Sequence, residues 1–370
     1  MDIIRGLQEA MPGQGVAAMV ITPGADLRYV AGYDAKPLER LTALVIPATG
    51  SAFMVAPELE GHEALSSSFG AAGGEVITWG ETEDPFAIVA SRISVLPAGA
   101  VAVDDHMWAE RVLRLRALLP DREQVPAGSL LRGRRLVKTE SEIEYLAQAA
   151  AAIDAVHAQV PSILRPGMTE AAAGALIADA ILKAGHVQVD FVIVASGPNG
   201  ASPHPSVSDR VMQVGDPVVV DIGGTMPSGY CSDCTRTYVL GEPSADYQAA
   251  YDVLLSAQQQ ASELVGPGRT CESIDGCARE VMASFSLDGA PLAEYFIHRI
   301  GHGIGLESHE EPYLVQGNEL PLAPGMAFSV EPGFYVSGKY GARIEDIVVC
   351  TADGVRSLNN RPRELVRIPA

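Results

Sequence analysis

Apolar residues in the first third of the chain follow two alternating patterns. Short runs of β-favouring residues are separated by longer stretches in which apolar residues recur at helical spacing. This alternation predicts an α/β domain over residues 1–130, in which no cluster of histidines, cysteines or paired acids occurs. The expected strands are 15–22, 44–46, 53–55, 76–79 and 101–103, and the expected helices are 85–96 and 107–119.

A second domain is predicted over residues 138–370. Thr139 and Glu142 form the sequence of a capping box, and the apolar spacing that follows predicts a long helix. The preceding basic residues are interpreted as a solvated linker. They are Arg132, Arg134, Arg135 and Lys138.

This second domain repeats itself once. Pro-Gly-x-Thr occurs at 166–169 and again at 267–270, each time between two helical patterns and before strands. In each copy two acids follow in apolar, strand-like surroundings, and a pseudo-twofold axis would bring all four to a shared centre. The four acids are Asp221, Asp233, Glu331 and Glu345.

Four clustered carboxylates in apolar strands predict a metal site. They repel each other and resist desolvation unless cations offset their charge. Two divalent cations would balance them, and His302, as a neutral imidazole, would complete the ligand set. For the hairpin alone a simpler interpretation stays open, in which Asp221 caps a turn and Asp233 pairs with Arg236. Cys231 and Cys234 would point to opposite faces of a strand and are interpreted as packing residues.

Charge and composition exclude several classes of partner. The formal net charge is −20 and the pI is about 4.7, which argues against binding to nucleic acid or anionic membranes. No run approaches the roughly 18 apolar residues of a membrane span, and no secretory signal is recognisable. Five cysteines, an odd number, fit a reducing compartment. A cytoplasmic protein is expected.

These motifs together resemble a known family. Asp221-x-Gly with Asp233-x-Thr-Arg-Thr, His302-Gly-x-Gly, Glu331-Pro-Gly and Arg-Ile-Glu345 are similar to the pita-bread metallopeptidases, which include prolidase and aminopeptidase P. The stretch 27–32, Leu-Arg-Tyr-Val-Ala-Gly, resembles the creatinase-type N-terminal domain, which has a ribonuclease H-like α/β fold. The resemblance implies an α+β pita-bread catalytic domain with an internal pseudo-twofold repeat, and a homodimer.

The resemblance also implies the metal ligands. Asp221 matches the ligand of one metal ion, Asp233 and Glu345 match the acids that bridge both ions, and His302 and Glu331 match the remaining ligands of the other. The oxygen-rich set favours Mn²⁺, with Co²⁺ or Zn²⁺ as alternatives. Two such cations would share a water molecule, lower its pKa and supply hydroxide as the nucleophile, with Glu331 taking the proton.

Three further residues match substrate-side positions of the family. His204 and His309 match histidines that act on the scissile carbonyl or the leaving nitrogen, and Arg343 matches an arginine that could hold the substrate's carboxyl end. The predicted reaction is hydrolysis of the Xaa-Pro bond, in dipeptides rather than in longer peptides as in aminopeptidase P. Two alternatives from other classes are a metal-free creatinase-like C–N hydrolase and a catalytically silent binding module.

Overall fold

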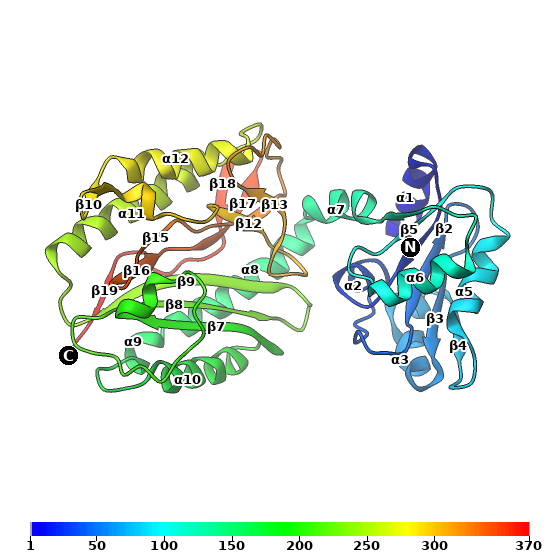
Figure 1. Cartoon of the computed structure of the whole chain (residues 1–370), viewed down its shortest axis with the longest axis horizontal. Coiled ribbons are helices and arrows are strands. Elements are labelled where there is room, and N and C mark those ends of the chain that lie inside the picture. Colours follow the sequence, from blue (N-terminus) through cyan, green and yellow to red (C-terminus); the bar gives the residue numbers. More distant parts are fainter. Residues whose placement is uncertain (1, 370) are drawn as a thin grey trace. The chain divides into compact units, whose positions relative to one another are not determined.

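The computed structural model describes residues 2–369 and divides into two compact units, one ending at Arg135 and the other beginning at Leu136. The first unit, blue to cyan in Figure 1, is built on one six-stranded sheet in the order β4-β3-β2-β1-β5-β6. β2 is antiparallel to both of its neighbours, and the other pairs are parallel. The strands are β1 (Val16–Ile21), β2 (Ala43–Pro47), β3 (Phe53–Pro57), β4 (Glu75–Trp79), β5 (Ala100–Val103) and β6 (Gln124–Pro126).

Helices cover both faces of this sheet. Because side chains alternate along a strand, β1 sends Met19 and Ile21 to one face, where Leu7 packs, and Val20 to the other, where Val89 packs. The two cores explain why the apolar runs predicted strands without polar alternation. The helices are α1 (Asp2–Ala10), η1 (Met11–Gln14), α2 (Ala25–Ala31), η2 (Glu58–Glu60), α3 (Gly61–Ser66), α4 (Ser68–Ala71), α5 (Pro85–Ser94), α6 (Ala109–Leu118) and α7 (Gly128–Leu136).

The basic stretch between the units is not a solvated linker. Arg135, in α7, is buried and forms an ion pair with Asp26 at 2.9 Å. Lys138 is also buried and forms an ion pair with Glu310 at 2.6 Å. The linker interpretation was therefore wrong for these two cations, because each has a carboxylate partner more than a hundred residues away in the sequence.

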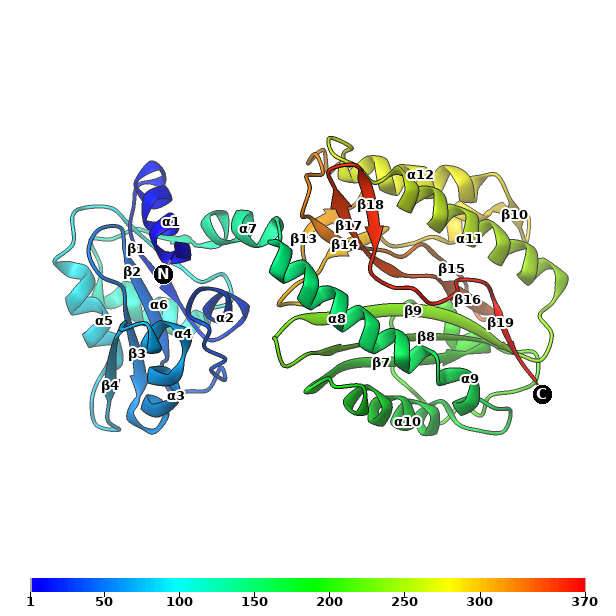
Figure 2. The same cartoon turned by 180° about the vertical axis from the view of Figure 1, so that it is seen from behind.

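The second unit, cyan-green to red in Figures 1 and 2, contains two larger sheets and helices packed on them. One sheet has the order β19-β9-β8-β7 and the other the order β13-β12-β14-β17-β18, and two hairpins, β10-β11 and β15-β16, complete the strands. The strands are β7 (Gln188–Ser196), β8 (Pro217–Thr225), β9 (Cys231–Leu240), β10 (Ser286–Leu287), β11 (Ala290–Pro291), β12 (Gly301–Gly303), β13 (Glu310–Leu314), β14 (Ala327–Val330), β15 (Gly333–Val336), β16 (Tyr340–Arg343), β17 (Asp346–Thr351), β18 (Gly354–Ser357) and β19 (Val366–Ile368).

Each sheet has its own helix pair, and both views show them on the outer side of the unit. Ile153 of α8 and Ile177 of α10 pack in one core with the four-stranded sheet. Leu254 of α11 and Ile274 of α12 pack in another with the five-stranded sheet. The helices are α8 (Glu140–His157), α9 (Val160–Ile163), α10 (Glu170–Lys183), η3 (Gly197–Ala201), α11 (Ala245–Leu264), α12 (Cys271–Ala283) and η4 (Leu292–Tyr295).

The internal repeat is visible in local detail. Thr169 caps α10 and Thr270 caps α12, each by accepting a hydrogen bond from a backbone N–H three residues on. Gly167 and Gly268 have φ values of 85° and 81°, the left-handed conformation that glycine adopts at little cost. Both threonines also form isolated β-bridges. The two Pro-Gly-x-Thr segments therefore have the same conformation and cap a helix in the same way in both copies.

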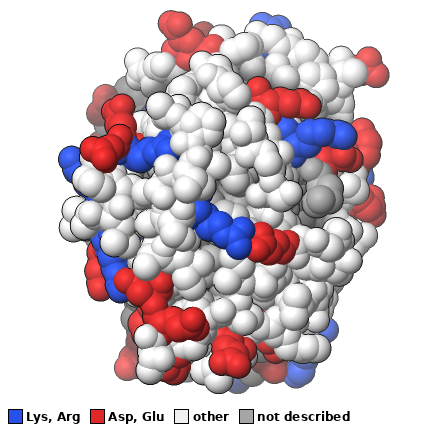
Figure 3. All heavy atoms as spheres, turned by 90° about the vertical axis from the view of Figure 1, so that its right-hand side faces the viewer, with Lys and Arg blue, Asp and Glu red and all other residues white. Residues whose placement is uncertain are grey.

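One face of the molecule carries mixed charge. On the face drawn in Figure 3, acidic and basic side chains are interspersed in small groups among uncharged ones. Binding to the phosphate backbone of a nucleic acid needs a broad basic patch. The described residues form no such patch on this face. None of the helices between residues 2 and 369 is long and apolar enough to cross a membrane.

Candidate metal centre and active site

Two buried aspartates project from one face of the β8–β9 hairpin. Asp221 lies opposite Thr235 in the antiparallel register, and Asp233 lies opposite Gly223. Directly opposed residues share a face of the sheet, and side chains two apart on a strand do so as well. Asp221 and Asp233 therefore point to the same side, and both are buried.

The simpler interpretations of this hairpin are not supported by its contacts. Arg236 forms its ion pair with Asp346 at 2.6 Å rather than with Asp233. Cys231 and Cys234 pack in two different core clusters, as expected for an offset of three on a strand. The two thiols therefore do not face a common site.

The second half of the repeat adds three more candidate ligands. His302 lies on β12, Glu331 directly follows β14, and Glu345 lies between β16 and β17. The backbone N–H of Glu331 donates to the carbonyl of Ile300 at 2.8 Å. Glu345 accepts a hydrogen bond from the Thr235 hydroxyl at 2.7 Å, and its N–H donates to the Thr235 carbonyl at 3.1 Å. The last contact fixes Glu345 against the hairpin that carries the aspartates.

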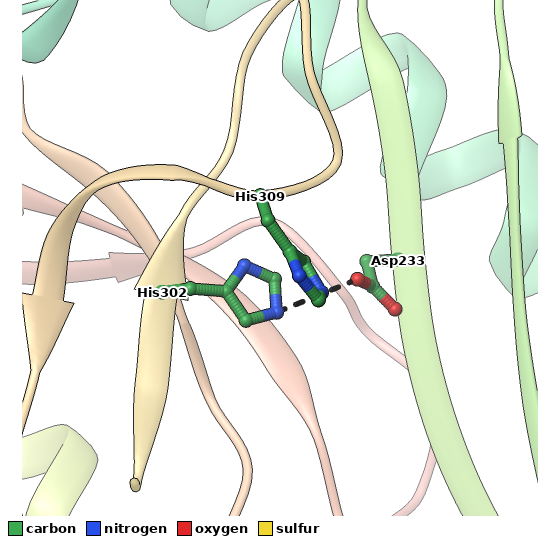
Figure 4. A group of neighbouring side chains, drawn as sticks. All are labelled: Asp233, His302 and His309. Carbon is green, nitrogen blue, oxygen red and sulfur yellow. Dashed lines mark ion pairs between the residues drawn. The ribbon is translucent and has the colours of Figure 1, made fainter. Parts of the chain in front are cut away.

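These side chains form one cluster. Nε2 of His302 lies 3.2 Å from Oε1 of Glu331 and 3.7 Å from Oδ2 of Asp233. The rings of His302 and His309 are 3.9 Å apart between centroids, and Figure 4 shows both imidazoles directed toward Asp233 on β9. Potential ligand atoms lie within 4.8 Å of one another in three overlapping groups. They are Asp221 with Asp233 and Glu345, His302 with Glu331 and Glu345, and Asp233 with His302 and His309.

The acids of the cluster are in electrostatic conflict. Burial raises the pKa of Asp233 well above its usual range, and the charges of Glu345, Asp221 and Glu331 raise it further. Burial also raises the pKa of Glu345, with Glu331 and Asp221 adding to the effect. Glu331 differs: burial opposes its ionisation, but the hydrogen bond from His302 and nearby positive charges outweigh it and lower its pKa to about 2.

The donor set fits divalent cations. Oδ1 of Asp221 is buried and has no hydrogen-bond partner among the described residues, although a buried carboxylate oxygen normally has one. The repulsion that raises the pKa values of Asp233 and Glu345 would be relieved by positive charge between the acids. Carboxylates with one imidazole are ligands that Mn²⁺, Co²⁺ and Zn²⁺ all accept.

Arg343 contacts the acid cluster from outside the cavity. Its side chain is 1% exposed, and its Nη2 donates to Asp221. Its Nε donates to Thr235 at 3.1 Å, and its Nη1 donates to the Pro203 carbonyl and to the Tyr335 hydroxyl. It does not line the cavity described next. Arg343 thus has a supporting contact to Asp221. Its expected contact with a substrate carboxyl group stays a prediction and would require these bonds to break.

The cluster opens into a cavity of about 530 Å³. One part of its wall is apolar and the rest is imidazole, hydroxyl, guanidinium and carboxylate. The lining residues are Phe191, Ile193, His204, Asp221, Asp233, His298, Arg299, His302, Ser308, His309, Glu331 and Glu345. All the candidate residues predicted from the sequence except Arg343 therefore face one space.

His204 and His309 are the imidazoles of this wall with the most solvent contact, although one side of the His309 ring is packed against His302. Burial lowers the pKa of His309 to about 4, and the neighbouring His302 and Arg299 add to this, against the opposing charge of Glu331. His309 is therefore neutral at pH 7 in the metal-free site. A neutral imidazole can donate one hydrogen bond and accept another.

Sequence reasoning missed two kinds of residue in the cavity. Phe191 and Ile193 lie on β7 and supply the apolar wall, but an apolar strand residue carries no sign of which cavity it faces. Arg299 stands between His298 and the His302 motif, within a stretch that was already recognised. Its positive charge in a site otherwise rich in acids was the signal that could have identified it.

Comparisons with known proteins agree with this geometry. Residues 144–352 match "Metallopeptidase family M24", and residues 4–137 match "Creatinase/Prolidase N-terminal domain". The chain is 51% identical to the crystal structure of dipeptidase PepE from Mycobacterium ulcerans, with a TM-score of 0.93 and coverage of 100% of this chain and 98% of the other. For a prolidase from Thermococcus sibiricus the identity is 34%, the TM-score is 0.91 and 98% of each chain is covered.

A third relative extends the pattern. An Xaa-Pro dipeptidase of Lactobacillus helveticus is 35% identical over 354 residues, which is 93% of this chain and 92% of the relative. The matches confirm the predicted fold, a creatinase-type N-terminal domain followed by a pita-bread domain with an internal repeat. They also confirm that the chain is an enzyme, a peptidase.

Proposed function

Because this chain belongs to metallopeptidase family M24, we propose that it hydrolyses the Xaa-Pro bond of dipeptides with the help of two divalent cations. The observation that carries the proposal is the convergence of four carboxylates and one imidazole on a single cavity. The names of the relatives, dipeptidase, prolidase and Xaa-Pro dipeptidase, support the substrate class.

The overlap of the three ligand groups supports a division of roles. Asp221 belongs to one group only and would hold one cation. Asp233 and Glu345 are the two residues that belong both to the Asp221 group and to a group containing His302, so they would serve both cations. His302 and Glu331, which lie outside the Asp221 group, would hold the second cation. Mn²⁺ is proposed because most of the ligand atoms are carboxylate oxygens. When bound, the cations supply Lewis-acid activation of a water molecule.

The protein's own groups would move the protons. The carboxylate of Glu331 faces the cavity and can accept the proton of the attacking water. His204 and His309 face the same cavity and can donate hydrogen bonds to the carbonyl oxygen as negative charge develops there. The C–N bond then breaks, and the proton passes to the departing proline nitrogen.

The cavity wall supports proline as the leaving residue. The amide before proline is tertiary and has no N–H, so a site that recognises its substrate through that hydrogen would fail. In this site the acids and imidazoles would act on the carbonyl group of the scissile bond, so no N–H is needed. Phe191 and Ile193 provide an apolar surface against which a pyrrolidine ring could pack.

The decisive assay compares Ala-Pro, Ala-Pro-Ala and Ala-Leu as substrates of the Mn²⁺-loaded protein. We expect Ala-Pro to be cleaved fastest and chelation to abolish cleavage. Faster cleavage of Ala-Pro-Ala would assign the chain to the aminopeptidase P type of activity. Full activity after removal of metal would overturn the metal-dependent mechanism and favour a metal-free hydrolase. No cleavage of any peptide by metal-loaded protein would favour a binding module.

Three further expectations stay predictions. The domain limits 1–130 and 138–370, the cytoplasmic location and the homodimer rest on the sequence and on the family resemblance. Analytical ultracentrifugation of the full chain tests the homodimer, because a single 38.9 kDa species would contradict it.

A further inference from the structure

Glu170, the first residue of α10, is a fully buried carboxylate that lies outside the cavity. It accepts four hydrogen bonds, and none of the described arginines and lysines forms an ion pair with it. Oε1 accepts from the backbone N–H and the hydroxyl of Ser196, both at 2.7 Å. Oε2 accepts from the Asn199 amide at 2.9 Å and from the Ser208 hydroxyl at 2.6 Å. Four donors offset the desolvation of a buried carboxylate, so Glu170 can stay buried without a cation.

These partners stand on both sides of the segment that carries His204. Ser196 is the last residue of β7, Asn199 lies in η3, and Ser208 comes nine residues after Asn199. Between them lie residues 202–207, the His204 segment, which are half-buried or exposed throughout. One carboxylate therefore joins the entry and the exit of a surface segment whose histidine lines the cavity. Tying both ends narrows the range of conformations that the segment can adopt.

A contact from the other copy of the repeat adds one fixed point within the segment. The carbonyl of Pro203 accepts a hydrogen bond from Nη1 of Arg343 at 3.1 Å, and the same guanidinium donates to Asp221. This bond places one backbone atom next to His204 relative to the metal centre. The chain on either side could still pivot about a single bond, and the four bonds to Glu170 restrict that motion.

The second copy of the repeat has the same helix start without the carboxylate. The backbone N–H of Glu170 donates to the Arg210 carbonyl at 3.0 Å, and that of Cys271 donates to the Leu320 carbonyl at 3.0 Å. Cys271 is the first residue of α12 and is buried as well, so it occupies the place of Glu170. The loop that it contacts, between β13 and β14, contributes no described residue to the cavity. Backbone bonds thus suffice to dock a loop on such a helix start, and the carboxylate is present in the copy whose loop carries a cavity imidazole.

We propose that Glu170 is a positioning residue that joins the two ends of the His204 segment and so holds this imidazole toward the scissile carbonyl. This inference rests on the proposed function, in which His204 donates a hydrogen bond to the carbonyl oxygen as negative charge develops there. A donor that is held in place for the transition state contributes little to binding of the ground state. Loss of the anchor should therefore lower kcat and leave KM nearly unchanged.

The central variant is Glu170→Gln, tested as full-length Mn²⁺-loaded protein with Ala-Pro. Glutamine has nearly the same shape, but its amide NH₂ must face two of the four donors. We expect kcat to fall about 10- to 100-fold, the order expected when a reacting group is displaced by about 1 Å, and KM to change by less than about threefold. Ser208→Ala, which removes only the exit bond, should lower kcat in the same way by a smaller factor. The Mn²⁺-induced rise in Tm should equal that of wild type in both variants.

A double-mutant cycle shows whether Glu170 acts through His204. His204→Ala alone should lower kcat by about 100-fold. Adding Glu170→Gln to it should lower kcat by less than about threefold more, because the imidazole that Glu170 positions is already gone. General damage to the fold would instead multiply the two losses. Multiplied losses, or an unchanged kcat in Glu170→Gln, would overturn the inference.

A matched control is Glu272→Gln in the second copy. Glu272, the second residue of α12, accepts a hydrogen bond from the backbone N–H of Gly317 at 3.1 Å and so contacts the loop that lies outside the cavity. This variant should keep the wild-type kcat.

Hydrogen exchange separates the inference from the proposed function. Amides of residues 202–207 should exchange faster in Glu170→Gln than in wild type, whereas those of 315–321 should not change. Equal exchange of 202–207 in the two proteins would overturn the anchor even if Ala-Pro is cleaved. If wild type cleaves no Xaa-Pro peptide, the proposed function fails and the catalytic role of the anchor fails with it, while faster exchange would still support the anchor itself.

Discussion

Replacing Lys138 by methionine should destabilise the second unit by about 3–5 kcal/mol. The ammonium group of Lys138 lies 2.6 Å from Oε1 of Glu310, and the two side chains are 1% and 8% exposed. Methionine fills a volume similar to that of lysine, so the main loss is the ammonium charge that pairs with the buried Glu310 carboxylate. Removal of one member of a buried ion pair takes away the charge that offsets its desolvated partner, and this costs far more than the pair itself contributes.

The assay can separate the two units because of where the tryptophans lie. The chain has two, and both Trp79 and Trp108 belong to the first unit. In urea titrations, Trp fluorescence therefore follows the first unit, and far-UV circular dichroism follows both. Lys138→Met should lower the midpoint of a circular dichroism transition and leave the fluorescence transition in place.

Two further variants test the cause. Lys339→Met breaks an exposed pair with Asp288 that is 2.7 Å long, and it should leave the unfolding midpoint nearly unchanged, because an exposed ion pair contributes little to stability. Adding Glu310→Gln to Lys138→Met removes the buried charge and should recover a large part of the loss. The reasoning is refuted if Lys138→Met is as mild as Lys339→Met, or if the added Glu310→Gln makes the protein less stable still.

Three other predictions concern the metal centre and one buried histidine. Mn²⁺ at about a hundredfold excess over its dissociation constant should stabilise the metal-free protein by about 2.7 kcal/mol, and an unchanged Tm would contradict metal binding by the native fold. Alanine at His302 or Glu331 should lower kcat/KM by about 100-fold or more, whereas serine at both Cys231 and Cys234 should change it by less than about threefold; the reverse order would contradict the proposed ligand set. Burial and the charge of Arg236 lower the pKa of His157 to about 3. Between about pH 6.5 and 3, His157 is therefore protonated in the unfolded chain but neutral in the folded one. Stability should therefore fall as the pH drops from about 6.5 to 3, and His157→Gln should flatten this slope by about 1.4 kcal/mol per pH unit in urea titrations; an identical slope would contradict it.

The fold could be predicted largely because its signals are local. Apolar spacing predicted five of the six strands of the first unit, all except β6, and Thr139, Thr169 and Thr270 predicted helix starts that the structure has. The acids were found because two carboxylates on one hairpin face, repeated in a second copy, are costly without cations. The spacing of the acids was sufficient to predict this, because side chains alternate along a strand and residues an even number apart share a face.

The features that the sequence did not predict depend on contacts between segments far apart in the chain. Lys138 stands in a run of basic residues, which is usually solvated, and only folding places Glu310 against it. Arg343 precedes Ile344 and Glu345 in a recognisable motif, but spacing cannot tell whether its guanidinium points into a cavity or behind it. Arg299 became visible only when the cavity wall was known.

The position of β19 shows how the two copies of the repeat are joined into one folding unit. The last strand of the chain pairs in parallel with β9, so the tail of the second copy completes the sheet of the first. Arg343 and Glu345 add side-chain bonds from the second copy to Asp221 and Thr235 of the first.

A chain that ended at Leu240 would leave β9 as an open edge, ready to pair with any other strand. It would also carry two buried aspartates without the arginine that accompanies one of them. Neither copy is therefore a self-sufficient module, although each resembles the other. Duplication of such a unit has yielded a protein in which the tail of one half completes the sheet of the other, so the second unit must fold and unfold as a single cooperative body.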